Sequence, residues 1–163
     1  MDNIDTPLPR LLAILRESDL FQDLTSSEMG DLIIRLRMIR AQKGYEIIRQ
    51  GDSWDSFYVI ISGRVSVRVK KGPKVLKLAD LGKGEFFGEM ALLVNQPRNA
   101  TITSEEISEL LVLKKSEFDN VLMRNPFRAQ KIRTAYVQRQ AKLKKENLKN
   151  TAKGPKKTSA LFA

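Results

Sequence analysis

The 163-residue sequence contains no cysteine and no histidine. The first absence excludes disulfide bonds, thiol nucleophiles and thiolate zinc sites, and the second excludes imidazole bases. Catalysis would have to rely on carboxylate, lysine, tyrosine or serine groups, and the sequence offers no acid–base constellation built from them. We therefore expect no enzymatic activity, no cofactor and no metal.

Long apolar runs are also missing. No uninterrupted stretch could span a bilayer, and no charged-then-apolar leader follows Met1. The sequence therefore predicts a soluble protein located in the cytoplasm. Its hydrophobic share of 42% is ordinary for a globular domain, and its length suits one domain with a real core.

Acidic residues are scarce toward the C-terminus. Residues 124–157 hold twelve Lys or Arg and one acid, Glu146, which gives +11, whereas the remaining 17 basic and 18 acidic residues sum to −1. Such a segment could bind an anionic partner, either a nucleic acid or a membrane surface. Plain solvation and a protein or dimer contact are the other interpretations of the same charge.

Two hydrophobic patterns divide the chain. Residues 6–18 and 25–36 carry apolar side chains at helical spacing, and Thr25 with Glu28 forms a capping-box pattern. From residue 38 to 114 short β-branched runs alternate with glycines, which is typical of an antiparallel sandwich or barrel. The strand candidates are residues 45–49, 57–62, 65–69, 75–81, 100–103 and 107–114.

Helical patterns return near the C-terminus. Ser116 is the expected cap of a short helix, and Asn125 with Pro126 is expected to start a longer one. The apolar stripe of the longer helix is formed by Ala129, Ile132, Tyr136 and Leu143. The predicted organisation is an N-terminal helix in residues 1–18, a domain in residues 19–148 and a basic, disordered tail in residues 149–163.

Residues 84–102, GEFFGEMALLVNQPRNATI, carry the most specific chemistry. Gly88 allows the backbone to approach a ligand closely, and the helical run that follows can aim its first amides at an anion. Glu89 offers an acceptor for sugar hydroxyls, and Arg98 offers a planar fork of donors for phosphate oxygens. The small Ala100 leaves its own N–H open to the same anion. The stretch can therefore seat a phosphate and a sugar together.

This stretch closely resembles the phosphate-binding cassette of the cyclic-nucleotide-binding domain family. The family pattern is Phe-Gly-Glu, an apolar helical turn and Pro-Arg-x-Ala-Thr, and the sequence matches it at about nine positions. Glycines and apolar residues outside the cassette extend the resemblance to roughly residues 19–135. It implies an α+β fold, in which an antiparallel β-roll of double-stranded β-helix or jelly-roll type is flanked by N-terminal helices and a C-terminal helix pair.

The resemblance also implies a ligand, a 3′,5′-cyclic nucleotide. Arg98 would pair with its phosphate, Glu89 with its ribose 2′-hydroxyl, and Asn99 and Ala100 would complete the phosphate cradle. Asn99 replaces the Ala, Ser or Thr often found at this position and indicates neither nucleotide. Cyclic AMP is therefore favoured over cyclic GMP on family prevalence only. The implied ligand-binding residues are Phe87, Gly88, Glu89, Met90, Ala91, Arg98, Asn99 and Ala100. The candidate base contacts are Val67 and Leu78, and the candidate lid residues are Ile132, Ala135 and Tyr136.

We therefore expect a cytosolic cyclic-nucleotide receptor that signals to a downstream protein through movement of its C-terminal helix. The alternative is a nucleic-acid or anionic-membrane adaptor that uses residues 124–157, with the β-roll as a non-binding scaffold. A kinase regulatory subunit or a channel fragment is a third hypothesis. The absence of an Arg-Arg-x-Ser/Ala/Gly segment before the domain disfavours the kinase subunit.

Overall fold

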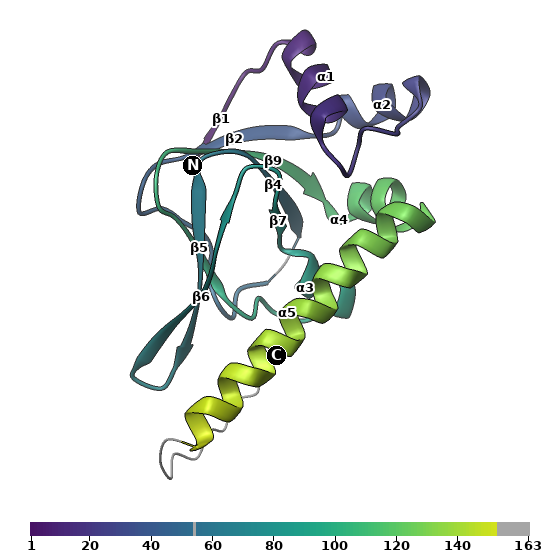
Figure 1. Cartoon of the computed structure of the whole chain (residues 1–163). Coiled ribbons are helices and arrows are strands. Elements are labelled where there is room, and N and C mark those ends of the chain that lie inside the picture. The colour runs from purple at the N-terminus through teal and green to yellow at the C-terminus, as the bar shows by residue number, and fades with distance from the viewer. Residues whose placement is uncertain (54, 153–163) are drawn as a thin grey trace.

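The structure is a computed structural model that describes residues 1–53 and 55–152. Two antiparallel sheets form a β-roll, and helices from both ends of the chain pack beside it (Figure 1). The strands are β1 (Asp2–Asn3), β2 (Arg37–Ala41), β3 (Glu46–Ile48), β4 (Ser56–Ser62), β5 (Arg64–Lys71), β6 (Lys74–Gly82), β7 (Phe86–Phe87), β8 (Thr101–Ser104) and β9 (Ser108–Lys114). The helices are α1 (Leu8–Glu17), α2 (Ser26–Ile33), α3 (Glu89–Val94), α4 (Lys115–Glu117), the π-helix η1 (Phe118–Met123) and α5 (Pro126–Ala152).

One sheet has the strand order β1-β2-β9-β4-β7, and the other has the order β3-β8-β5-β6. Consecutive side chains of the central strands β4 and β9 are buried. Since alternate side chains point to opposite sides of a sheet, both faces of these strands are covered. Phe57 and Val59 of β4 pack toward the helices, whereas Tyr58 and Ile60 pack inside the roll against the second sheet. The sheet that contains β4 therefore separates two hydrophobic cores, one of them inside the roll.

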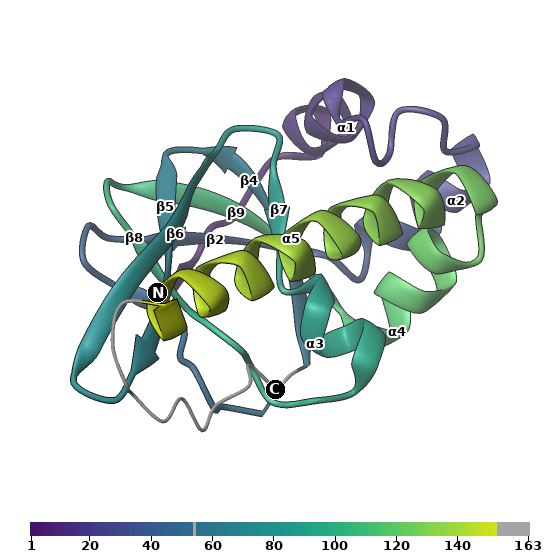
Figure 2. The same ribbon diagram turned by 60° about the horizontal axis from the view of Figure 1, so that its bottom comes forward.

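The helices that flank the roll form the other core. Buried residues of α1, α2, η1 and α5 meet the outer face of the first sheet, with Leu15, Leu32, Leu122 and Ile132 fully or almost fully buried. From this helical end α5 runs across the roll toward β5 and β6 (Figure 2). This arrangement confirms the predicted β-roll with N-terminal helices and a C-terminal helix pair.

The predicted helix starts at Thr25 and Asn125 are correct. The Thr25 hydroxyl accepts a hydrogen bond from the Glu28 N–H at 3.1 Å, and the Asn125 side chain accepts from the N–H groups of Phe127 and Arg128. The predicted cap at Ser116 is wrong. Its hydroxyl donates to the neighbouring Glu117 carboxylate, and the helix begins at Lys115 with Lys114 as the N-cap, two residues before the predicted cap.

Two further differences from the predicted elements concern β2 and the end of α5. Strand β2 was not among the strand candidates, because Met38 and Ile39 are both buried, on opposite faces, and give no alternation of polar and apolar residues. Helix α5 continues through Ala152, past the predicted boundary at residue 148. The rest of the predicted tail, residues 153–163, lies outside the described residues. Within the described residues 1–53 and 55–152, no helix combines the length and the apolar character needed to cross a membrane.

Candidate functional site

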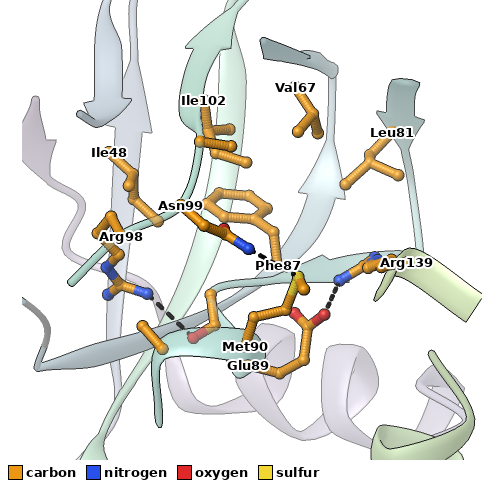
Figure 3. A pocket seen from close by; sticks show the side chains of 13 residues that line it. Ile48, Val67, Leu81, Phe87, Glu89, Met90, Arg98, Asn99, Ile102 and Arg139 are labelled. Atoms are coloured by element: carbon orange, nitrogen blue, oxygen red, sulfur yellow. Dashed lines mark hydrogen bonds and ion pairs between the residues drawn. The ribbon is translucent and has the colours of Figure 1, made fainter. Parts of the chain in front are cut away.

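A cavity of about 60 Å³ lies between α3, the second sheet and α5 (Figure 3). All eight residues that the sequence assigned to ligand binding line this cavity, namely Phe87, Gly88, Glu89, Met90, Ala91, Arg98, Asn99 and Ala100. The structure thus brings the whole cassette to one place. The ring of Phe87 stacks on Tyr58 inside the roll, with the ring centroids 4.9 Å apart, and forms part of the cavity wall.

Gly88 sets the start of the cassette helix α3. Its φ of +93° lies in the left-handed region, which side chains disfavour. A Cβ atom at this position would also meet the Ser56 carbonyl oxygen and the Arg98 guanidinium at 3.0 Å each. Glycine is therefore required here both by backbone conformation and by the close approach of Arg98.

Arg98 is the buried cation of the site, with 6% of its surface exposed. Its guanidinium donates to two main-chain carbonyls, that of Gly88 at 3.0 Å and that of Ser56 at 2.7 Å. Burial lowers the pKa of Arg98 below its usual value, and Tyr58, Asp55 and Glu89 partly oppose this shift. No ion pair joins Arg98 to a carboxylate within the described residues, so its charge lacks a direct counter-ion there.

Glu89 is the buried anion of the site and is fully inaccessible. Its carboxylate pairs with Arg139 of α5, whose Nη1 lies 2.5 Å from Oε1. The other oxygen, Oε2, is buried and has no hydrogen-bond partner within the described part of the chain. A buried acceptor without a donor is costly, and native structures contain few of them. Oε2 of Glu89 is therefore a candidate acceptor for a ligand.

The remaining wall of the cavity is apolar. It is formed by side chains from five strands, Ile48, Val67, Leu81, Phe87 and Ile102. Of the two candidate base contacts, Val67 lines the cavity, whereas Leu78 packs against the neighbouring cluster of Val69, Ala100 and Leu143. A bulge explains the position of Leu78: Val67 pairs with Ala79 and Arg68 pairs with Lys77, so Leu78 has no partner opposite it.

The structure does not bring the three candidate lid residues to the cavity. Ile132 is buried in the helical core, and neither Ala135 nor Tyr136 is among the lining residues. The residues of α5 that reach the site lie further along the helix. Arg139 lines the cavity, and Leu143 packs against Val69 and Ala100 beside it.

Sequence reasoning missed four lining residues, Ile48, Leu81, Ile102 and Arg139. The three apolar ones follow from strand positions that face the inside of the roll. Arg139 carried no signal of its own, because it is one of many basic residues on a lysine-rich helix. Its distance of 50 residues from Glu89 makes their contact a property of the tertiary fold.

Comparisons with known proteins agree with this fold and site. Residues 38–125 match the cyclic nucleotide-binding domain family. The chain is 30% identical, over 85% of its length, to a cAMP-dependent protein kinase regulatory subunit from Blastocladiella emersonii, of which it covers 36%. Among solved structures it is similar to the regulatory domain of Toxoplasma gondii PKA in complex with cAMP, with a TM-score of 0.63 and 28% identity over 72% of this chain and 46% of that one. It is also similar to the Thermus thermophilus catabolite activator protein, with a TM-score of 0.65 and 29% identity over 83% of this chain and 63% of that one.

The fold and the cavity thus define a β-roll binding domain. The chain belongs to the cyclic nucleotide-binding domain family, which confirms the resemblance seen in its cassette. It spans about a third or less of the length of the curated relatives that it matches, several of which are cAMP-dependent protein kinase regulatory subunits.

Proposed function

We propose that this chain is a receptor module that binds a 3′,5′-cyclic nucleotide in the cassette cavity. The observation that carries the proposal is the buried guanidinium of Arg98, which contacts carbonyl oxygens and no carboxylate within the described residues. A buried charge is costly unless a counter-ion neutralises it. A cyclic phosphodiester carries one negative charge that does not titrate near neutral pH, and would supply this counter-ion.

The two ionic groups of the cavity suit the two polar parts of this ligand. Glu89 and Arg139 neutralise one another, so the uncompensated charge of the site is that of Arg98. Arg98 would bind the phosphate with help from the main chain at Asn99 and Ala100, and Glu89 Oε2 would accept from the ribose 2′-hydroxyl. The base would lie against apolar side chains such as Val67.

Binding requires the cavity to widen, because sites for small molecules usually measure about 300–1,000 Å³. The contacts of Leu143 with Val69 and Ala100 are apolar, and Asn99 Nδ2 makes only a weak contact of 3.3 Å with the Met90 sulfur. These side chains can move at low cost. Displacement of Leu143 would shift the distal part of α5, which is how we expect binding to be signalled to a downstream protein in the cytoplasm.

Cyclic AMP is our preferred ligand. The regulatory domain of T. gondii PKA, which resembles this chain, was crystallised with cAMP. Asn99 contacts Met90 at the cavity wall, and its amide can both donate and accept hydrogen bonds, so it does not exclude cyclic GMP. The alternative of an anionic partner for residues 124–157 remains a prediction, and the part of that segment described, through residue 152, is helical.

Thermal unfolding of the whole chain, without nucleotide and with cyclic AMP or cyclic GMP, tests the proposal. A ligand at one hundred times its dissociation constant should add about 2.7 kcal/mol of stability. AMP serves as a matched control, since it has the same base and ribose but an open phosphate. We expect a clear shift with cyclic AMP, a smaller one with cyclic GMP and none with AMP. No shift with either cyclic nucleotide at millimolar concentration would refute the proposed function.

A further inference from the structure

The long helix α5 has one face on the molecule and one face in solvent. Its inner face carries the buried Ile132 and Leu143 and the cavity residue Arg139. On its outer side Figures 1 and 2 show no other helix or strand of the described residues. The helix is 27 residues long, which corresponds to about 40 Å. Its outer face is therefore an extended surface of its own, separate from the cassette cavity.

Three large apolar side chains lie on this outer face. Phe127 is 77% exposed, Val137 63% and Leu148 72%. At about 100° of rotation per residue they fall within about 80° of one another, on the side of the helix away from the roll. The smaller Thr134 and Ala141, which are also exposed, lie between them. We call these five residues the outer stripe, and an apolar stripe that remains exposed is typical of an interaction surface.

Exposed lysines border the outer stripe on both sides, and one lies within it. On one border are Lys131, Lys142 and Lys149, on the other is Lys144, and within the stripe is Lys145. Helix α5 contains a single acidic residue, Glu146, which is half-buried and pairs with Lys149 at 3.5 Å. The apolar side chains of the outer stripe are therefore set in a positively charged surface.

We propose that the outer stripe of α5 binds the surface of an anionic lipid bilayer. A basic amphipathic helix lies in the plane of such a surface, with its apolar side chains at the headgroup–acyl boundary and its lysines near the anionic headgroups. Lysine side chains suit this position, because their stems cover apolar surface while their ammonium groups stay in water. The inference goes beyond the proposed function, since this face lies opposite the cavity and needs no cyclic nucleotide.

Two other occupants fit the outer stripe less well. A second copy of this chain would bring Lys145 of one stripe close to the lysines of the other, where like charges repel. A nucleic acid is usually held by arginines and by aromatic side chains that stack on its bases. The outer stripe offers one aromatic ring, that of Phe127, and its other large side chains are aliphatic. A bilayer surface matches both the aliphatic side chains and the lysines around them.

Co-sedimentation of the full chain with lipid vesicles tests the proposal without nucleotide. The vesicles are phosphatidylcholine alone or with about 30% phosphatidylserine, and we expect binding only to the anionic ones, weakened in about 0.5 M salt. Lys144→Gln combined with Lys145→Gln should lower this binding about tenfold or more, because each lysine at an anionic surface contributes about fivefold. Lys43→Gln combined with Lys83→Gln removes the same charge from exposed positions outside α5 and should change binding less than about twofold.

A fluorescent label measures whether the outer stripe enters the headgroup region. The sequence contains no cysteine, so Val137→Cys creates a unique site for a polarity-sensitive fluorophore. On anionic vesicles the emission of this label should shift to shorter wavelength and become brighter. The same label on Lys43→Cys, which is exposed and lies outside α5, should not respond.

Each of three outcomes would overturn the proposal. Equal losses in the two lysine pairs would mean that net charge alone drives binding. A label at residue 137 that does not respond on bound vesicles would show that the stripe stays outside the bilayer. No binding to anionic vesicles, or tighter binding to a duplex DNA oligonucleotide in the same buffer, would assign the lysines to another role. Thermal melting confirms that each variant is folded, and if the Lys144 and Lys145 variant does not fold, the label decides. The proposed function is tested separately, by nucleotide binding.

Discussion

Two buried arginines of this protein have opposite surroundings. Arg128, at the start of α5, is 4% exposed, and its guanidinium reaches Asp23 at 3.2 Å, Glu28 at 3.5 Å and the Val121 carbonyl oxygen at 3.0 Å. Arg98, in the cassette, is almost equally buried, but its guanidinium donates hydrogen bonds only to main-chain carbonyl oxygens among the described residues. One cation is neutralised by the fold, and the other keeps a charge that an anion can satisfy.

The comparison distinguishes an arginine that stabilises the fold from an arginine that is proposed to bind a ligand. Arg128 connects the N-terminal end of α5 to α2 and to the residues before α2. Ala129 and Ile132, at the same end of α5, are also buried. An uncompensated buried charge such as that of Arg98 costs stability, and proteins tolerate such costs mainly at functional sites. The same residue type should therefore give two different mutant phenotypes.

The largest effect is expected at Arg98. Arg98→Ala should weaken cyclic AMP binding by about 2–5 kcal/mol, or tens- to thousandsfold, the cost of truncating one member of a buried charge pair. The melting temperature of the nucleotide-free protein should change little, because the lost carbonyl contacts are offset by removal of an uncompensated charge. Calorimetric titration and thermal melting measure the two quantities. Wild-type affinity in this variant would exclude the proposed role of Arg98.

Arg128 should show the reverse pattern, with a smaller free-energy change. Arg128→Ala removes contacts with two carboxylates, but Asp23 and Glu28 have about half of their side-chain surface exposed and can be rehydrated. We expect a loss of about 1–3 kcal/mol in the free energy of unfolding. Cyclic AMP affinity should stay within about twofold of wild type, since Arg128 does not line the cavity.

Urea denaturation measures the stability of Arg128→Ala, and the exposed Arg124 provides a matched control through Arg124→Ala. The control should unfold like the wild-type chain. If Arg128→Ala lost ligand affinity and kept its stability, the contrast between the two arginines would be wrong. A loss of both ligand affinity and stability would show that the N-terminal end of α5 and the binding site are coupled.

The sequence could predict those parts of the site that depend on residues close together in the chain. The cassette lies in one short stretch of sequence, so its residue types and the family resemblance could predict the eight residues Phe87–Ala91 and Arg98–Ala100, and all of them line one cavity. The β-roll was likewise predictable from the strand pattern and the resemblance. Leu78 was predicted to contact the base because of its period-2 position, and that role stays a prediction. In the structure it lies beside the cavity, because a bulge, which no period-2 pattern reveals, changes the register next to it.

The residues of α5 show where sequence reasoning ends. Its apolar positions predicted which side faces inward, and Ile132 and Leu143 are indeed buried. The pattern does not determine how far along the helix the cavity lies, because that depends on the crossing of α5 over the roll (Figure 2). The lid was therefore predicted at residues 132–136, whereas contact with the cassette occurs at Arg139 and Leu143.

A charged cluster at the surface can be compared with the two buried arginines. Here one carboxylate, Glu109 of β9, has two arginine partners: Arg10 of α1, in a close contact, and Arg40 of β2 at 3.2 Å. The hydrogen bond from Arg10 is the main cause that lowers the pKa of Glu109 below its ordinary 4.5, and Arg40 adds to it. Both arginines are more than 40% exposed, so solvent screens the cluster and its contribution should stay below about 1 kcal/mol.

The sign of the pH dependence follows from the lowered pKa. A carboxyl group whose pKa is lower in the folded state stabilises the fold above its unfolded value, and this stabilisation disappears as the pH falls through the folded value. Glu109→Gln should therefore be slightly less stable than wild type at pH 7, and the difference should vanish in acid, well below pH 4.5. Urea denaturation of both proteins at pH 7 and pH 3 measures it. A difference that grew on acidification would mean that Glu109 is not held in its charged form by Arg10 and Arg40.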